Sequence, residues 1–244
     1  PNSKLGGSNV KIKPLRLLVA TLLLVATTAL AQGDPNTLTV ALSGNVETTD
    51  PHTAASRAVP FLENVYEPLV GLQGPTFDLS PVLAESVDVS EDQTVYTFNL
   101  RPGVKFHDGS PLTADAVLYS FERVRGIQAG PYWAISYLET VEAVDDLTVT
   151  MTIRPRGPPF LQAVSMVGIV SPEAFRAASN DGDAWGETWA ATNTAGTGPY
   201  RLTEIVRGDR FVLEAFDDYW GGWDGEHFQR AVMLLVPEAS TAQL

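Results

Sequence analysis

The stretch Leu100–Thr113, LRPGVKFHDGSPLT, decides how this chain folds. It continues from Thr94–Leu100, where apolar and polar residues alternate with the period of a half-buried strand. Within the stretch, Val104–Phe106 predicts the end of a strand and His107-Asp108-Gly109 predicts a reversal of the chain. Thr113 is a suitable N-cap for a helix. The stretch therefore predicts a strand, a turn and the start of a helix in close succession.

The residues after Thr113 predict an amphipathic helix. Its apolar positions fall at i, i+3, i+4, i+7 and i+10, namely Ala114, Val117, Leu118, Phe121 and Val124. A second helix is expected from Ser171-Pro172-Glu173 through Ala178, because proline is tolerated in the first turn. A third is expected over Pro60–Tyr66.

Several further segments predict strands, by alternation or by β-branched and aromatic content. They are Thr37–Leu42, Val141–Val144, Leu147–Ile153, Tyr200–Val206, Arg210–Phe216 and Gln229–Val236. Asp145-Asp146 and Gly208-Asp209 are the expected hairpin turns. Strands and helices are interspersed without a regular βαβ rhythm, which predicts a mixed α/β fold.

The N-terminus has the three parts of a secretory signal peptide. Lys11, Lys13 and Arg16 precede the apolar run Leu17–Ala26, and small residues follow up to Ala31. The run is shorter than the ~20 residues that a bilayer span needs, although a membrane anchor is the alternative interpretation. We expect residues 1–31 to be removed by cleavage after Ala31, with residues 1–9 as possible upstream read-through. A periplasmic protein is predicted.

The composition excludes several classes of function. The chain has 29 acidic against 16 basic residues and a net charge of −13, so binding to nucleic acid through a basic face is not expected. It contains no cysteine, which excludes disulfides, thiolate metal sites and attachment of lipid to an N-terminal cysteine. We therefore predict a protein that is not a lipoprotein and that needs no metal or cofactor.

Motifs for catalysis are sparse. HExxH, GxSxG and GxxxxGK[ST] do not occur, and Gly196-Thr197-Gly198 precedes a proline, so it predicts a tight turn rather than a dinucleotide loop. His107-Asp108 would leave most of a metal site unfilled. A carboxylate pair for hydrolysis stays open, although Asp145-Asp146 and Asp217-Asp218 fit solvated turns better. Aromatic residues in Gly-, Pro- and Asp-rich surroundings are candidate cleft walls; they are Tyr132-Trp133, Trp185, Trp189, Tyr219-Trp220 and Trp223.

An ordered set of motifs resembles the family 5 extracellular solute-binding proteins of ABC importers, the dipeptide, oligopeptide and nickel group. Leu100–Thr113 is its strongest member. The others, in order, are Asp50-Pro51-His52, Tyr66–Val70, Pro81–Ser86, Gly196–Tyr200 and Tyr219–Gly222. Each motif is weak alone, but their order and spacing match across residues 37–240.

The resemblance implies the first lobe of a hinged, two-lobed protein of the type II periplasmic binding fold. Residues 32–50 and 194–244 would form a discontinuous sheet domain, and residues 51–193 an inserted α+β subdomain. In such proteins the ligand lies between lobes and its binding drives closure. The resemblance implies that this chain is an N-terminal fragment in which the second lobe is absent.

The resemblance also implies a site and its partners. Extended peptides pair with a segment after the Asp-Pro-His motif, which maps to Ala54, Ala55 and Ser56, and an aromatic after the capped helix maps to Tyr132, with Trp133 beside it. A monomer that delivers small peptides to the transmembrane subunits of an ABC permease is expected, with no catalysis of its own. The alternatives are a cargo of nickel chelates, oligosaccharides or opines, a secreted carboxylate-dependent hydrolase, or an adhesion or chaperone module.

Overall fold

A computed structural model describes residues 34–44, 46–54, 59–73, 78–155 and 159–236. The predicted signal peptide, residues 1–31, lies outside the described residues, and so do Ala55 and Ser56. None of the helices in the described ranges is long and apolar enough to cross a membrane.

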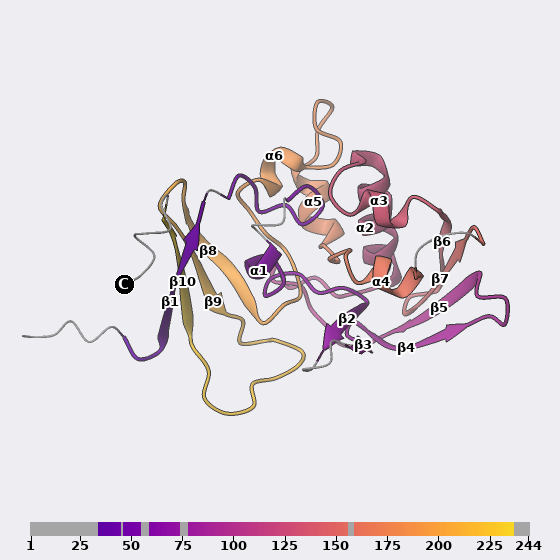
Figure 1. Ribbon diagram of the computed structural model, residues 1–244, viewed down its shortest axis with the longest axis horizontal. Coiled ribbons are helices and arrows are strands. Elements are labelled where there is room, and N and C mark those ends of the chain that lie inside the picture. The colour runs from indigo at the N-terminus through magenta and orange to yellow at the C-terminus, as the bar shows by residue number, and fades with distance from the viewer. Residues whose placement is uncertain (1–33, 45, 55–58, 74–77, 156–158, 237–244) are drawn as a thin grey trace, which may run out of the picture. The chain divides into compact units, whose positions relative to one another are not determined.

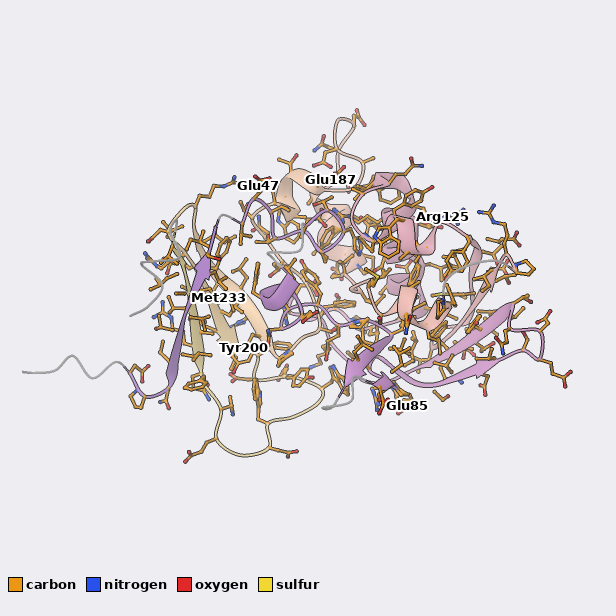
Figure 2. All side chains as sticks on the ribbon, in the orientation of Figure 1. Glu47, Glu85, Arg125, Glu187, Tyr200 and Met233 are labelled. Atoms are coloured by element: carbon orange, nitrogen blue, oxygen red, sulfur yellow. The ribbon has the colours of Figure 1, made fainter. Side chains whose placement is uncertain are left out.

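One four-stranded sheet joins the beginning of the described chain to its end. Its strand order is β1 (Thr37–Ser43), β10 (Arg230–Val236), β9 (Arg210–Ala215) and β8 (Tyr200–Val206). β1 runs parallel to β10, whereas β10, β9 and β8 are antiparallel neighbours. The four strands lie side by side in Figure 1, and Figure 2 labels Met233 and Tyr200 on them. All four strands were predicted from the sequence to within a residue or two.

A second four-stranded sheet is antiparallel throughout, in the order β4 (Ala84–Val89), β5 (Val95–Leu100), β7 (Thr148–Ile153) and β6 (Leu138–Asp145). Residues on β5 and β7 alternate between half-buried and buried along each strand, as the sequence pattern predicts. The predicted turn between β6 and β7 is present, and Leu147 N donates to Asp145 Oδ1 at 2.9 Å. A small hairpin, β2 (Val70–Gln73) with β3 (Asp78–Pro81), and strand β4 were not predicted.

The predicted amphipathic helix is α2 (Ala114–Ile127). All five apolar positions of its stripe belong to one core or pack against it. Thr113 occupies the N-cap position, but its side chain makes no capping hydrogen bond, so that part of the prediction is wrong. The second predicted helix, α5 (Pro172–Ala178), does have its cap, because Ser171 accepts a hydrogen bond from the amide of Ala174.

The remaining helices are short. α1 (Val59–Leu62) is shorter than the predicted Pro60–Tyr66, while α3 (Tyr132–Ile135), α4 (Phe160–Val164) and α6 (Glu187–Ala190) were not predicted. A helix of about one turn shows no 3.6-residue period, so nothing in the sequence pattern marks it.

Two clusters of buried side chains form the interior. The first contains Phe98, Phe106 and Met151 beneath the second sheet, and the second contains Phe61 and Phe211 beside the first sheet. Helix α2 contributes to both, because Phe121 belongs to the first cluster and Tyr119 to the second. α2 is thus the element that both cores share.

Two details differ from expectation, one in Leu100–Thr113 and one in Gly196–Gly198, whose Gly196 O accepts from His107 N at 2.8 Å. Val104–Phe106 is no strand end, since β5 already ends at Leu100 and only Lys105 makes an isolated bridge, to Pro111. Gly196 and Thr197 have no regular structure and Gly198-Pro199 is a bend that leads into β8, and Gly198 N donates to Val65 O at 3.0 Å. A Cβ atom on Gly196 would lie 1.9 Å from Val65 O, so glycine there permits close contact of two backbones.

Candidate functional site

The segment Asp50–Ala54 is held by hydrogen bonds to Asp50. The Asp50 carbonyl accepts from Ala54 N at 2.9 Å and from Thr53 N at 3.3 Å. Its carboxylate accepts from His52 N at 2.9 Å. Asp50 and His52 are both fully buried, so the turn that leads to Ala54 is part of the interior.

Arg123 of α2 supplies the counter-charge for Asp50. Its Nη1 and Nη2 donate to the two carboxylate oxygens at 2.8 and 2.6 Å, and its Nε donates to Trp185 O at 2.8 Å. The guanidinium also lies over the ring of Phe175, 4.7 Å from the centroid. Both charged side chains are almost completely buried, at 0% and 1% exposure, which makes this a bidentate ion pair of the kind arginine forms best.

His52 completes the network as a neutral ring. Its Nε2 is 2.9 Å from Gly168 O and therefore carries the proton, because a carbonyl can only accept. Its Nδ1 then accepts from Arg123 Nη1 at 3.0 Å. Burial, reinforced by the charge of Arg123, lowers the pKa of His52 from 6.5 to about 4.

The loop after α2 packs against this segment. α2 ends at Gln128, which has a left-handed φ of 57° and donates its amide to Val124 O. A Cβ atom on Gly130 would lie 2.4 Å from His52 O and 3.4 Å from Thr53 N, so the loop backbone touches the backbone of the Asp50–Ala54 segment. The loop between Gln128 and Tyr132 is therefore packed against the Asp50–Ala54 segment at Gly130.

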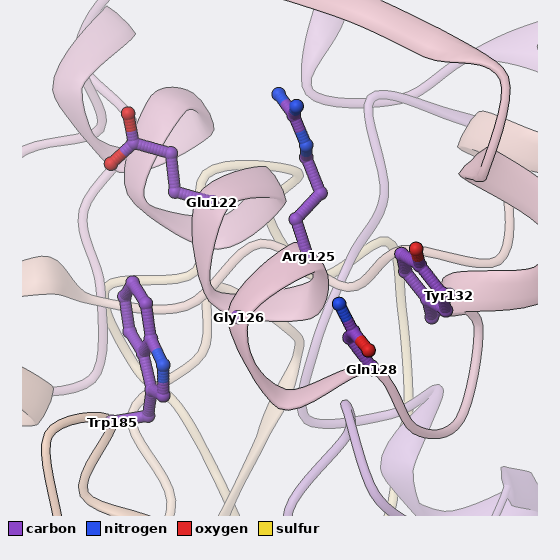
Figure 3. Close-up of a pocket in the computed structure, with 6 residues that line it drawn as sticks. All are labelled: Glu122, Arg125, Gly126, Gln128, Tyr132 and Trp185. Carbon is purple, nitrogen blue, oxygen red and sulfur yellow. The ribbon is translucent and has the colours of Figure 1, made fainter.

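A pocket of about 470 Å³ lies at the C-terminal end of α2. Its lining residues are Glu122, Arg125, Gly126, Gln128, Tyr132 and Trp185. Trp185 and Tyr132 stand on opposite sides of the helix end, with Gln128 between them (Figure 3). A Cβ atom on Gly126 would meet the indole of Trp185 at 2.4 Å, so the indole lies directly on the helix. Aromatic walls with a few polar groups are typical of sites for small molecules.

The predicted site residues are placed as follows. Tyr132 lines the pocket, and Ala54 packs against the second core. Trp133 is 64% exposed and does not line the pocket. Ala55 and Ser56 lie outside the described residues. Gly130, two residues before Tyr132, contacts His52 and Thr53 of the Asp50–Ala54 segment, and Ala54 itself does not line the pocket.

Sequence reasoning missed Arg123 and Asp50, although a signal was present. Arg123 falls on the buried side of α2 together with Ser120 and Val124. Arg123 lies outside the predicted apolar stripe but follows Ala116 and Ser120 on the adjoining face, and a charged residue on a face of small residues can be buried with an acid as partner.

A second hollow of about 480 Å³ lies beside strand β8. Its lining residues are Thr192, Asn193, Thr194, Leu202, Thr203, Glu204, Ile205 and Arg207. It has no aromatic wall, which favours the pocket of Tyr132 and Trp185 as the candidate site. In the described part of the chain, no group of three or more His, Cys, Asp or Glu residues could hold a metal ion.

Comparison with known proteins decides the family. Residues 78–244 match the bacterial extracellular solute-binding proteins, family 5 Middle. The chain belongs to this family. The resemblance seen in the sequence motifs is thereby confirmed.

Relatives of this family 5 chain include the dipeptide-binding protein of Escherichia coli K12, which is 32% identical over 95% of this chain and 46% of its own length. A solved structure, the ABC transporter-associated periplasmic binding protein DppA from Helicobacter pylori in complex with peptide STSA, is 28% identical and superposes with a TM-score of 0.71. That match covers 84% of this chain and 43% of the other. The mixed α/β fold of this protein class is confirmed, and the chain spans less than half the length of the curated relatives it matches.

Proposed function

We propose that this chain is the substrate-binding component of an ABC importer, that it captures small peptides in a cleft next to Tyr132, and that it delivers them to the membrane permease. Its relatives include a dipeptide-binding protein and a periplasmic protein with a bound peptide. The observation that supports the proposal is the contact of Gly130 with His52 and Thr53, because Gly130 lies between two residues that line the aromatic pocket, Gln128 and Tyr132, and touches the segment expected to pair with a peptide backbone.

The proposal extends to location and organisation. The chain acts as a monomer in the periplasm, exported by the segment that ends at Ala31 and carrying no lipid. Residues 32–50 and 194–244 form the sheet domain of one lobe and residues 51–193 its inserted subdomain. Tyr132, Ala54, Ala55 and Ser56 contact the solute, with Trp133 at the rim, and a facing lobe completes the cleft.

Binding without turnover is the expected behaviour. The protein expressed from its whole reading frame is purified under native conditions, and native mass spectrometry identifies any bound small molecule. Added di- and tripeptides should raise the melting temperature as RT ln(1 + [L]/Kd) predicts, and the peptides should be recovered intact.

Other results would replace parts of the proposal. A co-purified nickel chelate, oligosaccharide or opine would keep the fold and change the cargo. Peptide cleavage that is lost when one carboxylate is changed to its amide would instead establish a hydrolase. Neither stabilisation nor turnover, together with capture of a protein partner, would indicate an adhesion or chaperone module.

A further inference from the structure

We propose that Arg123 is a positioning residue of the solute site, which holds the backbone that leads to Ala54 and the Trp185 wall of the pocket in one arrangement. The inference rests on the proposed function only for the identity of the solute. The coupling that it describes is a property of the described residues themselves.

A single guanidinium connects segments that are distant in the sequence. Arg123 on α2 binds the Asp50 carboxylate and the Trp185 carbonyl directly. Through Nη1 it also binds His52, whose other ring nitrogen donates to Gly168 O. Movement of any one of these segments would therefore leave a buried donor or acceptor unpaired, which is unfavourable and most so for a charged group.

The Asp50–Ala54 segment and the Trp185 wall of the pocket both depend on these bonds. The Asp50 carbonyl holds the amide of Ala54 at 2.9 Å, and the Asp50 carboxylate is fixed by Arg123. The Trp185 carbonyl accepts from Arg123 Nε, while its indole lies on Gly126 and lines the pocket. Arg123 thus links the amide of Ala54, through Asp50, to the backbone of Trp185.

Bulk stability does not account for an ion pair at this place. Replacing a buried ion pair with apolar residues of similar volume is often neutral or stabilising, because desolvation offsets the Coulomb attraction. What a bidentate arginine adds is fixed geometry, since its planar fork has one orientation relative to a carboxylate. A site that needs the Asp50–Ala54 segment and Trp185 in one fixed arrangement would benefit from that geometry.

The same helix offers a matched control. Asp115 of α2 forms a bidentate pair with Arg176 of α5, at 2.7 and 2.9 Å, but both side chains are 54% exposed. Neither residue lines the pocket. Arg176→Lys therefore repeats the chemical change of Arg123→Lys on an exposed ion pair of α2, where the guanidinium lies over the ring of Tyr119, 4.9 Å from its centroid.

The test compares these two variants in the protein expressed from its whole reading frame. Hydrogen exchange reports on the amide of Ala54, and 19F NMR of fluorotryptophan-labelled protein reports on Trp185, assigned with Trp185→Phe. Arg123→Lys keeps the charge but cannot make the fork and the Nε bond together. It should speed Ala54 exchange about tenfold and shift the Trp185 resonance, whereas Arg176→Lys should leave Ala54 exchange unchanged. The Trp185 shift is compared with that of Arg176→Lys, because Arg176 lies over Tyr119 and the ring of Tyr119 lies 6.0 Å from that of Trp185.

A binding measurement separates this proposal from the proposed function. Trialanine is titrated by calorimetry, and Arg123→Lys should weaken binding about tenfold relative to wild type and Arg176→Lys. If wild type binds no peptide, the proposed function fails. Hydrogen exchange and 19F NMR then still decide whether Arg123 positions the two segments. If Arg123→Lys does not fold, the double variant Asp50→Asn/Arg123→Met removes both charges, and it should fold with the same local loosening.

Two results would overturn the proposal. One is wild-type Ala54 exchange and an unshifted Trp185 resonance in both the Arg123→Lys and the double variant. The other is an equal acceleration of every protected amide, because that would show a purely global loss of stability with no particular effect on the site.

Discussion

Phe106 shows how far one residue of the deciding stretch contributes to stability. Its ring has no exposed surface and belongs to the first core. Phe106→Ala should lower the free energy of unfolding by about 3–5 kcal/mol, because it removes apolar contact and leaves a cavity. Urea denaturation checks the value, and Phe228→Ala, at a ring that is 42% exposed, is the control. A loss below about 1 kcal/mol for Phe106→Ala would contradict the assignment of this ring to the core.

Tyr132 and Trp133 are adjacent aromatics with different surroundings. Tyr132 lines the pocket, whereas Trp133 is exposed and does not. Tyr132→Ala should weaken peptide binding about tenfold or more, because a ring that buries against a ligand contributes 1–3 kcal/mol, and it should barely change the melting temperature. Phe228→Ala, at an exposed ring that does not line the pocket, serves as the control. Equal affinity of Tyr132→Ala and wild type in calorimetry would remove Tyr132 from the site.

At the scale of elements, the predicted helices α2 and α5 differ in how their N-termini are capped. Ser171 accepts from the amide of Ala174 and also donates to Asp108, while Thr113 occupies the N-cap of α2 without any side-chain capping bond. Ser171→Ala should therefore destabilise the protein by about 1–2 kcal/mol, and Thr113→Ala by clearly less. Chemical denaturation of the two variants in parallel decides. Equal losses would mean that the hydroxyl of Ser171 contributes nothing as a cap.

At the scale of the whole molecule, buried histidines make stability depend on pH. Burial lowers the pKa of His52, and that of His107, from 6.5 to about 4. Between these values the unfolded chain binds protons that the folded chain does not, so each histidine removes up to about 3 kcal/mol of stability as the pH falls through this window. Glu67 opposes this at the acidic end, since burial raises its pKa and the folded state gains a proton first.

The expected outcome is a free energy of unfolding that decreases from pH 7 toward pH 4, with proton uptake on unfolding. Denaturant titrations at several pH values, together with calorimetry in buffers of different ionisation enthalpy, measure both quantities. Stability that stays constant or rises toward pH 4 would show that these histidines are already accessible to solvent in the folded state.

The sequence by itself determined most strands of both sheets, helix α2, helix α5 with its Ser171 cap, and the family. Two sequence patterns predicted these elements correctly: the period-two alternation of β5 and β7 and the apolar stripe of α2. Both arise because burial of one face of a strand or helix requires apolar residues at regular local spacing. Trp185 was also predicted from local sequence, because Gly- and Asp-rich surroundings made it a candidate cleft aromatic.

Only the tertiary structure decided the rest. The pairing of Arg123 with Asp50, the contact of Gly130 with His52 and the close approach of Gly196 to Val65 join residues far apart in the chain. Such contacts depend on where the chain returns to itself, and no local pattern encodes that distance. The short helices α3, α4 and α6 were not predicted for a different reason. A single turn is stabilised by packing and shows no 3.6-residue period in the sequence.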